Sequence, residues 1–115
     1  MNVNFISNSL VPLPRWSEAF PRLIMALPQS PEFKGGNPDS TLHFFDLNGF
    51  DIERSASTIK KWASGQSIVI ALSGNPTEQE AFTLIAAGAR GYCHVASKPD
   101  QLQEVARGAC GEFCV

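Results

Sequence analysis

Four polar residues of this 115-residue chain close or follow apolar runs, and their types suit chemistry at the edge of a sheet. Asp46 closes one run, Ser73 closes another, and Ser7 and Asn8 follow a third. A single carboxylate holds Mg²⁺ only weakly, because affinity for this ion depends on charged oxygen ligands. Ser7 and Asn8 supply oxygen acceptors without charge. The four residues therefore predict a polar site with little capacity for a metal ion.

The apolar pattern predicts the elements that position these residues. Short apolar runs rich in β-branched and aromatic residues predict five strands, at residues 2–6, 22–27, 41–46, 67–72 and 91–95. Helical spacing and capping residues predict helices at 15–20, at 51–63, after Thr77 and from Pro99. The run 22–27 also fits a continuing helix, but the prolines that flank it favour a strand. Strands that alternate with helices imply an α/β fold with a doubly wound five-stranded parallel sheet of order 2-1-3-4-5.

The spacing of apolar residues also predicts which helix faces are buried. The helix at 51–63 is predicted to bury Ile52, Ala56, Ile59 and Ala63. The helix after Thr77 is predicted to bury Phe82, Ile85, Ala86 and Ala89. Residues 28–40 contain three prolines and two glycines, so the helix after the second strand is predicted to be shortened or missing. Something else, such as a partner chain, would then cover that side of the sheet.

Composition limits the class of protein. A chain of this length with 43% hydrophobic and 17% charged residues is a single globular domain, residues 1–115. No apolar run is long enough to span a bilayer, no secretion signal begins the sequence, and a net charge of −2 argues against direct binding of nucleic acid. Three cysteines without metal-ligand spacing predict reduced thiols in a cytoplasmic protein. His43 and His94 lie in different predicted strands without a partner motif, so no metal site is predicted.

Three segments of the sequence resemble the second half of a response-regulator receiver domain of the NarL/LuxR type: Ile70–Ser73, Ala86–Tyr92 and Pro99–Leu102. The resemblance implies a flavodoxin-like fold and two-component signalling by a phosphorelay. It implies that Asp46 is equivalent to the aspartate that accepts a phosphoryl group. Ser73 is then equivalent to the hydroxyl residue that contacts the phosphate, and Tyr92 to the aromatic residue that moves when the domain switches.

The rest of the receiver site departs from the family pattern. Ser7 and Asn8 stand where the family has an acidic pair for Mg²⁺, and Val95 stands where it has a lysine. Lys98 lies three residues further along and would need a rearranged loop to compensate. A phosphoryl group on Asp46 would then keep most of its charge uncompensated. The sequence predicts a degenerate, atypical receiver with no cofactor and doubtful binding of Mg²⁺.

The expected function is that of a pseudo-receiver in a transcriptional regulator. It would act through protein contacts, as a homodimer and with a DNA-binding output domain, and it would not be an enzyme. Residues 108–115 resemble the exit that precedes a helix-turn-helix output domain of the LuxR family, so we expect the natural protein to be longer. Two alternatives stay open: a genuine phosphoacceptor that uses Asp46 and a histidine kinase, and a stand-alone adaptor or small-ligand binder. No glycine-rich phosphate loop follows the first strand.

Overall fold

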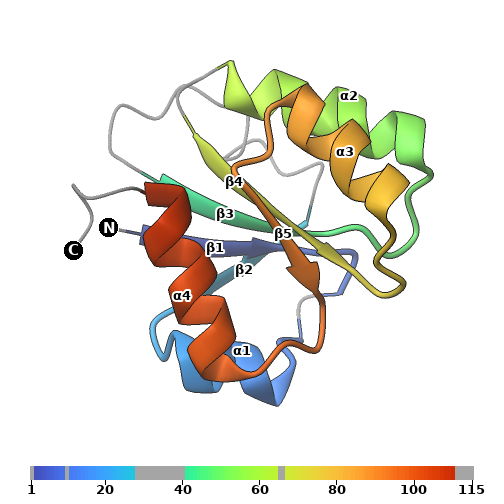
Figure 1. Cartoon of the computed structure of the whole chain (residues 1–115). Helices are drawn as coiled ribbons and strands as arrows, with labels where there is room; N and C mark the ends of the chain where they lie inside the picture. Colours follow the sequence, from blue (N-terminus) through green and yellow to red (C-terminus); the bar gives the residue numbers. More distant parts are fainter. Residues whose placement is uncertain (1, 10, 28–40, 65–66, 111–115) are drawn as a thin grey trace.

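One parallel sheet forms the centre of the molecule. A computed structural model describes residues 2–9, 11–27, 41–64 and 67–110. Its five strands are β1 (Asn2–Ile6), β2 (Ile24–Ala26), β3 (Thr41–Asp46), β4 (Ile68–Ser73) and β5 (Gly91–His94). All neighbouring strands are parallel, in the order β2-β1-β3-β4-β5 (Figure 1). The predicted fold class and strand order are confirmed, although β2 is only half as long as predicted.

Helices cover both faces of the sheet. They are α1 (Pro14–Ala19), α2 (Ile52–Ala63), α3 (Glu78–Ala87) and α4 (Pro99–Cys110). Helices α1 and α4 lie together on one face, and α2 and α3 lie together on the other (Figure 1). No helix in the described part of the chain is long and apolar enough to cross a membrane. The shortened or missing helix predicted at 28–40 falls outside the described residues.

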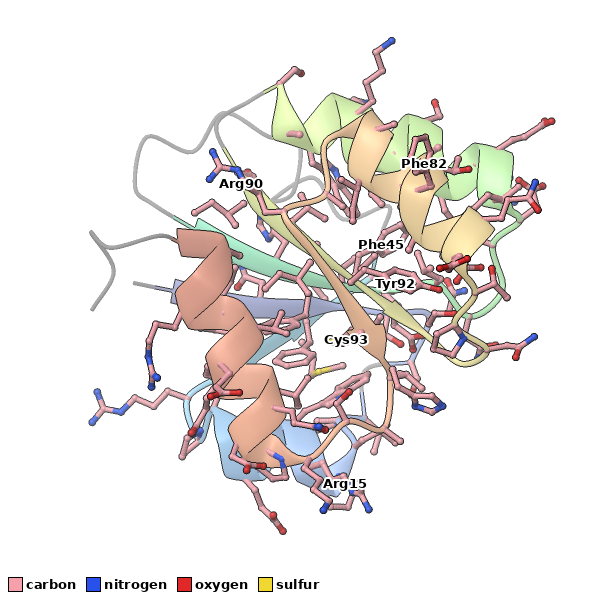
Figure 2. The ribbon with its side chains drawn as sticks, viewed as in Figure 1. Arg15, Phe45, Phe82, Arg90, Tyr92 and Cys93 are labelled. Atoms are coloured by element: carbon pink, nitrogen blue, oxygen red, sulfur yellow. The ribbon has the colours of Figure 1, made fainter. Side chains whose placement is uncertain are left out.

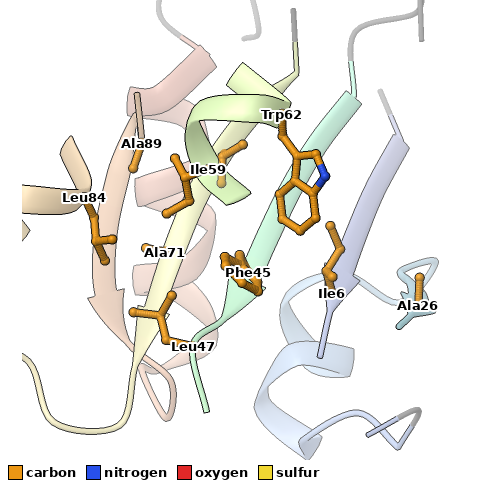
Figure 3. Packing of buried hydrophobic residues seen from close by; sticks show 10 residues of the cluster. Ile6, Ala26, Phe45, Leu47, Ile59, Trp62, Ala71, Leu84 and Ala89 are labelled. Atoms are coloured by element: carbon orange, nitrogen blue, oxygen red, sulfur yellow. The ribbon is translucent and has the colours of Figure 1, made fainter. Parts of the chain in front are cut away.

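The central strands contribute side chains to two separate cores. Successive side chains of a strand point to opposite faces, so Phe44 and Phe45 of β3 belong to different cores. On the α2/α3 side, the ring of Phe45 meets the edge of Trp62 at a centroid distance of 5.0 Å (Figure 3). On the α1/α4 side, Phe5 stacks between Trp16 at 4.7 Å and Phe44 at 4.6 Å. These contacts explain why β3 and β4 read as nearly unbroken apolar runs.

The buried face of α2 is rotated from the predicted one. Its buried residues are Ser55, Ile59 and Trp62, while Ile52 is 38% exposed. Only Ile59 was assigned correctly as fully buried. The large indole of Trp62 packs against Phe45 and determines which stripe of the helix faces the sheet.

The predicted buried face of α3 is wrong. Leu84 is fully buried, whereas Phe82 is 78% and Ile85 54% exposed. Ala86 is exposed as well, and the buried Ala89 lies beyond the end of the helix. Apolar residues occur all around this helix, so their spacing does not single out one stripe.

Close contact between α2 and α3 adds a constraint at the end of α3. Gly88 has a φ of +123°, and a Cβ atom on it would lie 2.8 Å from the Cβ of Ala63. A glycine is therefore required both by the backbone and by the neighbouring helix. The start of α3 was predicted correctly, because the Thr77 side chain caps it by accepting a hydrogen bond from the Glu80 amide at 3.1 Å.

A buried polar cluster lies at the amino-terminal half of β3. His43 is 5% exposed. Its Nδ1 lies 3.4 Å from the side-chain amide nitrogen of Asn4, and its Nε2 lies 3.1 Å from the Ser67 hydroxyl. Because an amide nitrogen only donates, Nδ1 accepts, and Nε2 carries the proton of the neutral ring. Burial lowers the pKa of His43 from 6.5 to about 4.

We predict that truncating Leu84 destabilises the fold far more than truncating Phe82. Leu84→Ala should lower the free energy of unfolding by about 2–5 kcal/mol, because it leaves a cavity in the α2/α3 core. Phe82→Ala should change it by less than about 0.5 kcal/mol, because the ring is exposed. Urea unfolding followed by circular dichroism measures both. Equal losses in the two variants would contradict the orientation of α3.

We predict that His43 makes the protein less stable as the pH falls from 6.5 to about 4. In this window the unfolded chain binds a proton at His43 and the folded chain does not, so unfolding becomes easier. The full loss amounts to roughly 3 kcal/mol. Urea unfolding at several pH values should show a flatter dependence for His43→Gln than for the natural chain. His94→Gln, which changes an exposed ring, is the control and should keep the natural slope.

Candidate functional site

The carboxyl ends of β1, β3, β4 and β5 surround one pocket. It has a volume of about 820 Å³, and five of the predicted site residues line it: Ser7, Asn8, Asp46, Ser73 and Val95. This is the edge at which doubly wound sheets bind their ligands, beside the point where the strand order reverses. The structure therefore brings together most of the residues that the sequence singled out.

Asp46 lies at the bottom of the pocket and is 9% exposed. Its Oδ2 accepts a hydrogen bond from the Ser7 hydroxyl at 3.0 Å, and its Oδ1 accepts one from the Asn48 amide at 3.0 Å. The Ser7 oxygen in turn accepts from the Ser9 amide at 3.2 Å. The single hydroxyl proton of Ser7 is thereby directed at the carboxylate, which is held in one orientation.

Asn8 fastens the loop after β1 to the loop after β3. Its side-chain amide donates to the Asn48 carbonyl at 2.9 Å. Gly49 follows with a φ of +90°, and a Cβ atom there would lie 2.5 Å from the Asn8 amide nitrogen. Asn8, which the family resemblance assigns to an acidic position, thus holds two loops together.

Ser73 is 3% exposed, and its hydroxyl accepts a hydrogen bond from the Asn75 amide at 3.1 Å. The Val95 amide donates to the Ser73 carbonyl at 2.9 Å, which continues the pairing of β4 with β5 beyond the strand ends. Ser73 therefore stabilises the turn after β4 while it lines the pocket.

The segment after β5 is bound to α1. The Trp16 indole donates to the Val95 carbonyl at 2.9 Å, and the Arg15 guanidinium donates to the Ala96 carbonyl at 2.5 Å. Lys98 is exposed at the start of α4, does not line the pocket, and donates its backbone amide to the Gln101 side chain at 3.3 Å. Lys98 is therefore not among the residues that the pocket brings together with Asp46.

Tyr92 packs against the α2/α3 core and reaches the start of α3 with its hydroxyl (Figure 2). The hydroxyl donates to the Glu80 carboxylate at 2.5 Å and accepts from the Thr77 amide at 3.1 Å. Burial and the hydrogen bond to Glu80 raise the pKa of Tyr92. The ring is thus held by Thr77 and Glu80 at the start of α3, and a hydrogen bond with the Ser73 side chain acts in the opposite direction on its pKa.

The residues around Asp46 do not fit a Mg²⁺ ion. A receiver fold implies this ion, but among the described residues that follow the strands into the pocket the carboxylate of Asp46 stands beside the neutral Ser7 and Asn8. The second carboxylate of the pocket, that of Glu80, comes from α3 and accepts a hydrogen bond from Tyr92. No group of three His, Cys, Asp or Glu side chains that could hold a metal occurs among the described residues. His43 and His94 do not form a pair, since His43 contacts Asn4 and Ser67 while His94 accepts from the Ala96 amide at 2.9 Å.

Of the three cysteine side chains, the structure describes that of Cys93. Cys93 is half-buried and unpaired by any disulfide, and burial raises its pKa. The side chain of Cys110 and all of Cys114 lie outside the described residues. The predicted reduced state of all three cysteines therefore remains a prediction.

Sequence reasoning missed several pocket residues. Val11 and Leu13, from the loop before α1, and Trp16, from α1 itself, form an apolar wall. Glu80 approaches from α3. Trp16 lies within the helix predicted at 15–20, and no local signal indicated that this helix would extend to the pocket.

The sheet order and the helices on both faces are those of the CheY-like receiver domains of response regulators. Solved structures with this fold include the CheY-like protein TadZ of Pseudomonas aeruginosa (TM-score 0.68, 17% identity, 97% of this chain and 96% of that chain). Another is a Burkholderia pseudomallei response regulator with a phosphorylated aspartic acid, a calcium ion and citrate (TM-score 0.68, 15% identity, 95% of this chain and 68% of that chain). A third is a putative CpaE2 pilus assembly protein of Sinorhizobium meliloti (TM-score 0.68, 13% identity, 95% of this chain and 99% of that chain).

These similarities establish the fold. The predicted receiver fold is confirmed by neighbours that cover nearly the whole chain. No protein-family model and no curated protein sequence matches the chain. The NarL/LuxR type and the roles of individual site residues stay predictions.

Proposed function

We propose that the chain is an atypical receiver domain, a pseudo-receiver, which acts through protein contacts and largely without Mg²⁺-dependent phosphorylation of Asp46. The observation that carries the proposal is the set of residues around this carboxylate. Ser7, Asn8 and Val95 line the pocket at the positions where the family has two acids and a lysine. The fold is kept while the charges that support phosphoryl transfer are absent from these positions.

Electrostatics supports this proposal. Phosphoryl transfer to an aspartate is assisted chiefly by cations that neutralise the charge on the phosphoryl oxygens. In the described part of the chain, the residues that line the pocket include two carboxylates, Asp46 and Glu80, and neither lysine nor arginine. A phosphoryl group on Asp46 would add negative charge to a site that already carries two.

The hydrogen bonds of the two switch-equivalent residues also favour a fixed domain. The Tyr92 hydroxyl has a donor in Thr77 and an acceptor in Glu80. The Ser73 hydroxyl already accepts a hydrogen bond from the Asn75 amide. A switch that moved both residues would have to break these bonds, at about 1 kcal/mol each.

The partner surface that we propose is the exposed face of α3. Phe82 is 78% exposed and points away from the sheet (Figure 2). Ile85 is 54% exposed, and Ala86 is exposed as well. Burying two large apolar side chains in an interface is favourable by about 1.5–3 kcal/mol each. We propose that this face forms a homodimer, that the domain controls a DNA-binding output domain, and that it catalyses no reaction of its own.

A second candidate is a genuine phosphoacceptor. Asp46 ends β3 and faces a pocket together with Ser73, and the Burkholderia neighbour is a response regulator with a phosphorylated aspartic acid. In this case a histidine kinase would be the partner, and Lys98 would have to leave the start of α4 to reach Asp46. The bonds from Arg15 and Trp16 to the segment after β5 disfavour that movement.

A third candidate is a stand-alone adaptor outside transcription. The putative CpaE2 neighbour is a pilus assembly protein, and its chain is covered almost completely. A role in an assembly of proteins agrees with the exposed apolar face of α3, and it needs neither a DNA-binding domain nor phosphorylation.

We predict that acetyl phosphate with Mg²⁺ adds no phosphoryl group to the natural chain. Intact-mass spectrometry after incubation measures the adduct. The triple variant Ser7→Asp/Asn8→Asp/Val95→Lys restores the missing charges and should gain one phosphoryl group, which a further Asp46→Asn change should remove. An adduct on the natural chain that is lost in Asp46→Asn would contradict the proposal and support the second candidate.

We predict a concentration-dependent dimer that the double variant Phe82→Glu/Ile85→Glu weakens. Each protomer of a homodimer contributes both side chains, and even a total loss of about 3 kcal/mol raises the dissociation constant on the order of a hundredfold, so we expect at least this effect. Size-exclusion chromatography with light scattering measures the mass. Val11→Glu, which changes a residue that is 75% exposed at the pocket, is the matched control and should leave the dimer intact. Equal weakening by the control would contradict the α3 interface.

A further inference from the structure

Asp46 carries a buried charge without a countercharge. The residue is 9% exposed, and its carboxylate accepts hydrogen bonds from one hydroxyl and one backbone amide, both neutral. In the part of the chain that the structure describes, no cationic side chain pairs with it. A buried ionised group without a partner of opposite charge is unfavourable, so the site should gain free energy from a cation.

The geometry of the carboxylate leaves room for a further donor. Each of its oxygens has two lone pairs, and Oδ1 and Oδ2 each use one, for Asn48 and Ser7. The pocket that opens above them has a volume of about 820 Å³, which suits a small molecule. A group with several hydrogen-bond donors and one positive charge would satisfy both the open lone pairs and the charge.

One wall of the same pocket is apolar. Val95, which directly follows β5, lines the pocket together with Trp16, Leu13 and Val11. Val11 is 75% and Leu13 38% exposed, which is a large apolar area for a loop of a small domain. A ligand with an aliphatic portion would cover this wall while its charged end reaches Asp46.

Together these features exclude two classes of ligand. Among the described residues that line the pocket, a small anion would meet two carboxylates and neither lysine nor arginine. A divalent metal ion requires several charged oxygen ligands. It would find only Asp46 and Glu80 among these residues, and the Glu80 carboxylate already accepts a hydrogen bond from the Tyr92 hydroxyl. A monovalent cation needs only the one charge that Asp46 supplies.

We propose that the pocket binds a small aliphatic amine in its ammonium form, with the nitrogen on the Asp46 carboxylate and the alkyl chain along Val95, Trp16 and Leu13. This binding adds a ligand to the proposed function. It rests on that function in one respect, because a carboxylate that is not used for phosphoryl transfer is available to a ligand. The amine would act as the signal that a phosphoryl group provides in other receivers.

The test compares three probes of equal chain length: hexylamine, hexanol and hexanoate. Amide and indole chemical shifts of the ¹⁵N-labelled full chain measure binding. Hexylamine should give saturable shifts at Ser7, Asn48 and the Trp16 indole, with a dissociation constant on the order of 1 mM, as expected for a ligand of this size. Hexanol should bind at least about tenfold more weakly, since it lacks the charge, and hexanoate should not bind.

Two variants establish the role of Asp46. Asp46→Asn should weaken hexylamine binding by about tenfold or more, which is about 1.4 kcal/mol. Val95→Lys keeps the carboxylate and should block the amine with its own ammonium group. Asp51→Asn is the control, because it removes a carboxylate outside the pocket and keeps a residue that caps α2, and it should bind as the natural chain does.

The inference fails if hexylamine causes no saturable shift, if hexanol binds equally well, or if Asp46→Asn and Val95→Lys both bind hexylamine normally. The incubation with acetyl phosphate and Mg²⁺ tests the proposed function separately, so failure of amine binding can be told apart from failure of the proposed function. Amine binding together with a phosphoryl adduct on Asp46 would overturn only the proposed function. Absence of both would overturn only the present inference.

Discussion

The structure depends on one constraint: both faces of β3 and β4 must be kept from water. Phe44 and Phe45 are adjacent in the chain, yet their rings belong to different cores, so neither helix layer alone could cover the strand. Ile70 and Ala71 of β4 divide in the same way. Polar side chains cannot remain within such strands without partners, and they therefore gather where the strands end. The position of the pocket is a consequence of the double burial of the sheet.

The strands and their order could be predicted because this constraint is recorded in the sequence as unbroken apolar runs. The faces of the helices could not be predicted equally well. A helix such as α3 carries apolar residues on every side, and the choice of Leu84 over Phe82 is made by the neighbouring strands and by α2. In α2 the buried Ser55 gives no hydrophobic signal, and the bulk of Trp62 decides the rotation of the helix. Local spacing contains no information about these neighbours.

The pocket was predictable to the extent that its residues follow strands, which holds for Ser7, Asp46 and Ser73. Its other walls come from residues remote in sequence, such as Trp16, whose indole bonds to the carbonyl of Val95, 79 residues further along the chain. The receiver fold therefore does not by itself decide the chemistry at this edge of the sheet. Packing of apolar side chains maintains the fold, while the side chains that follow the strands form the pocket.

The two tryptophans give the molecule two independent optical probes. Trp16 stacks on Phe5 in the α1/α4 layer, and Trp62 meets the edge of Phe45 in the α2/α3 layer. Both indoles are almost completely shielded from solvent, at 2% and 3% exposure. Emission from Trp62 alone would follow the layer whose outer face we assign to the dimer, while emission from Trp16 alone would follow the layer that borders the pocket. Loosening of either half of the fold is therefore visible without any attached label.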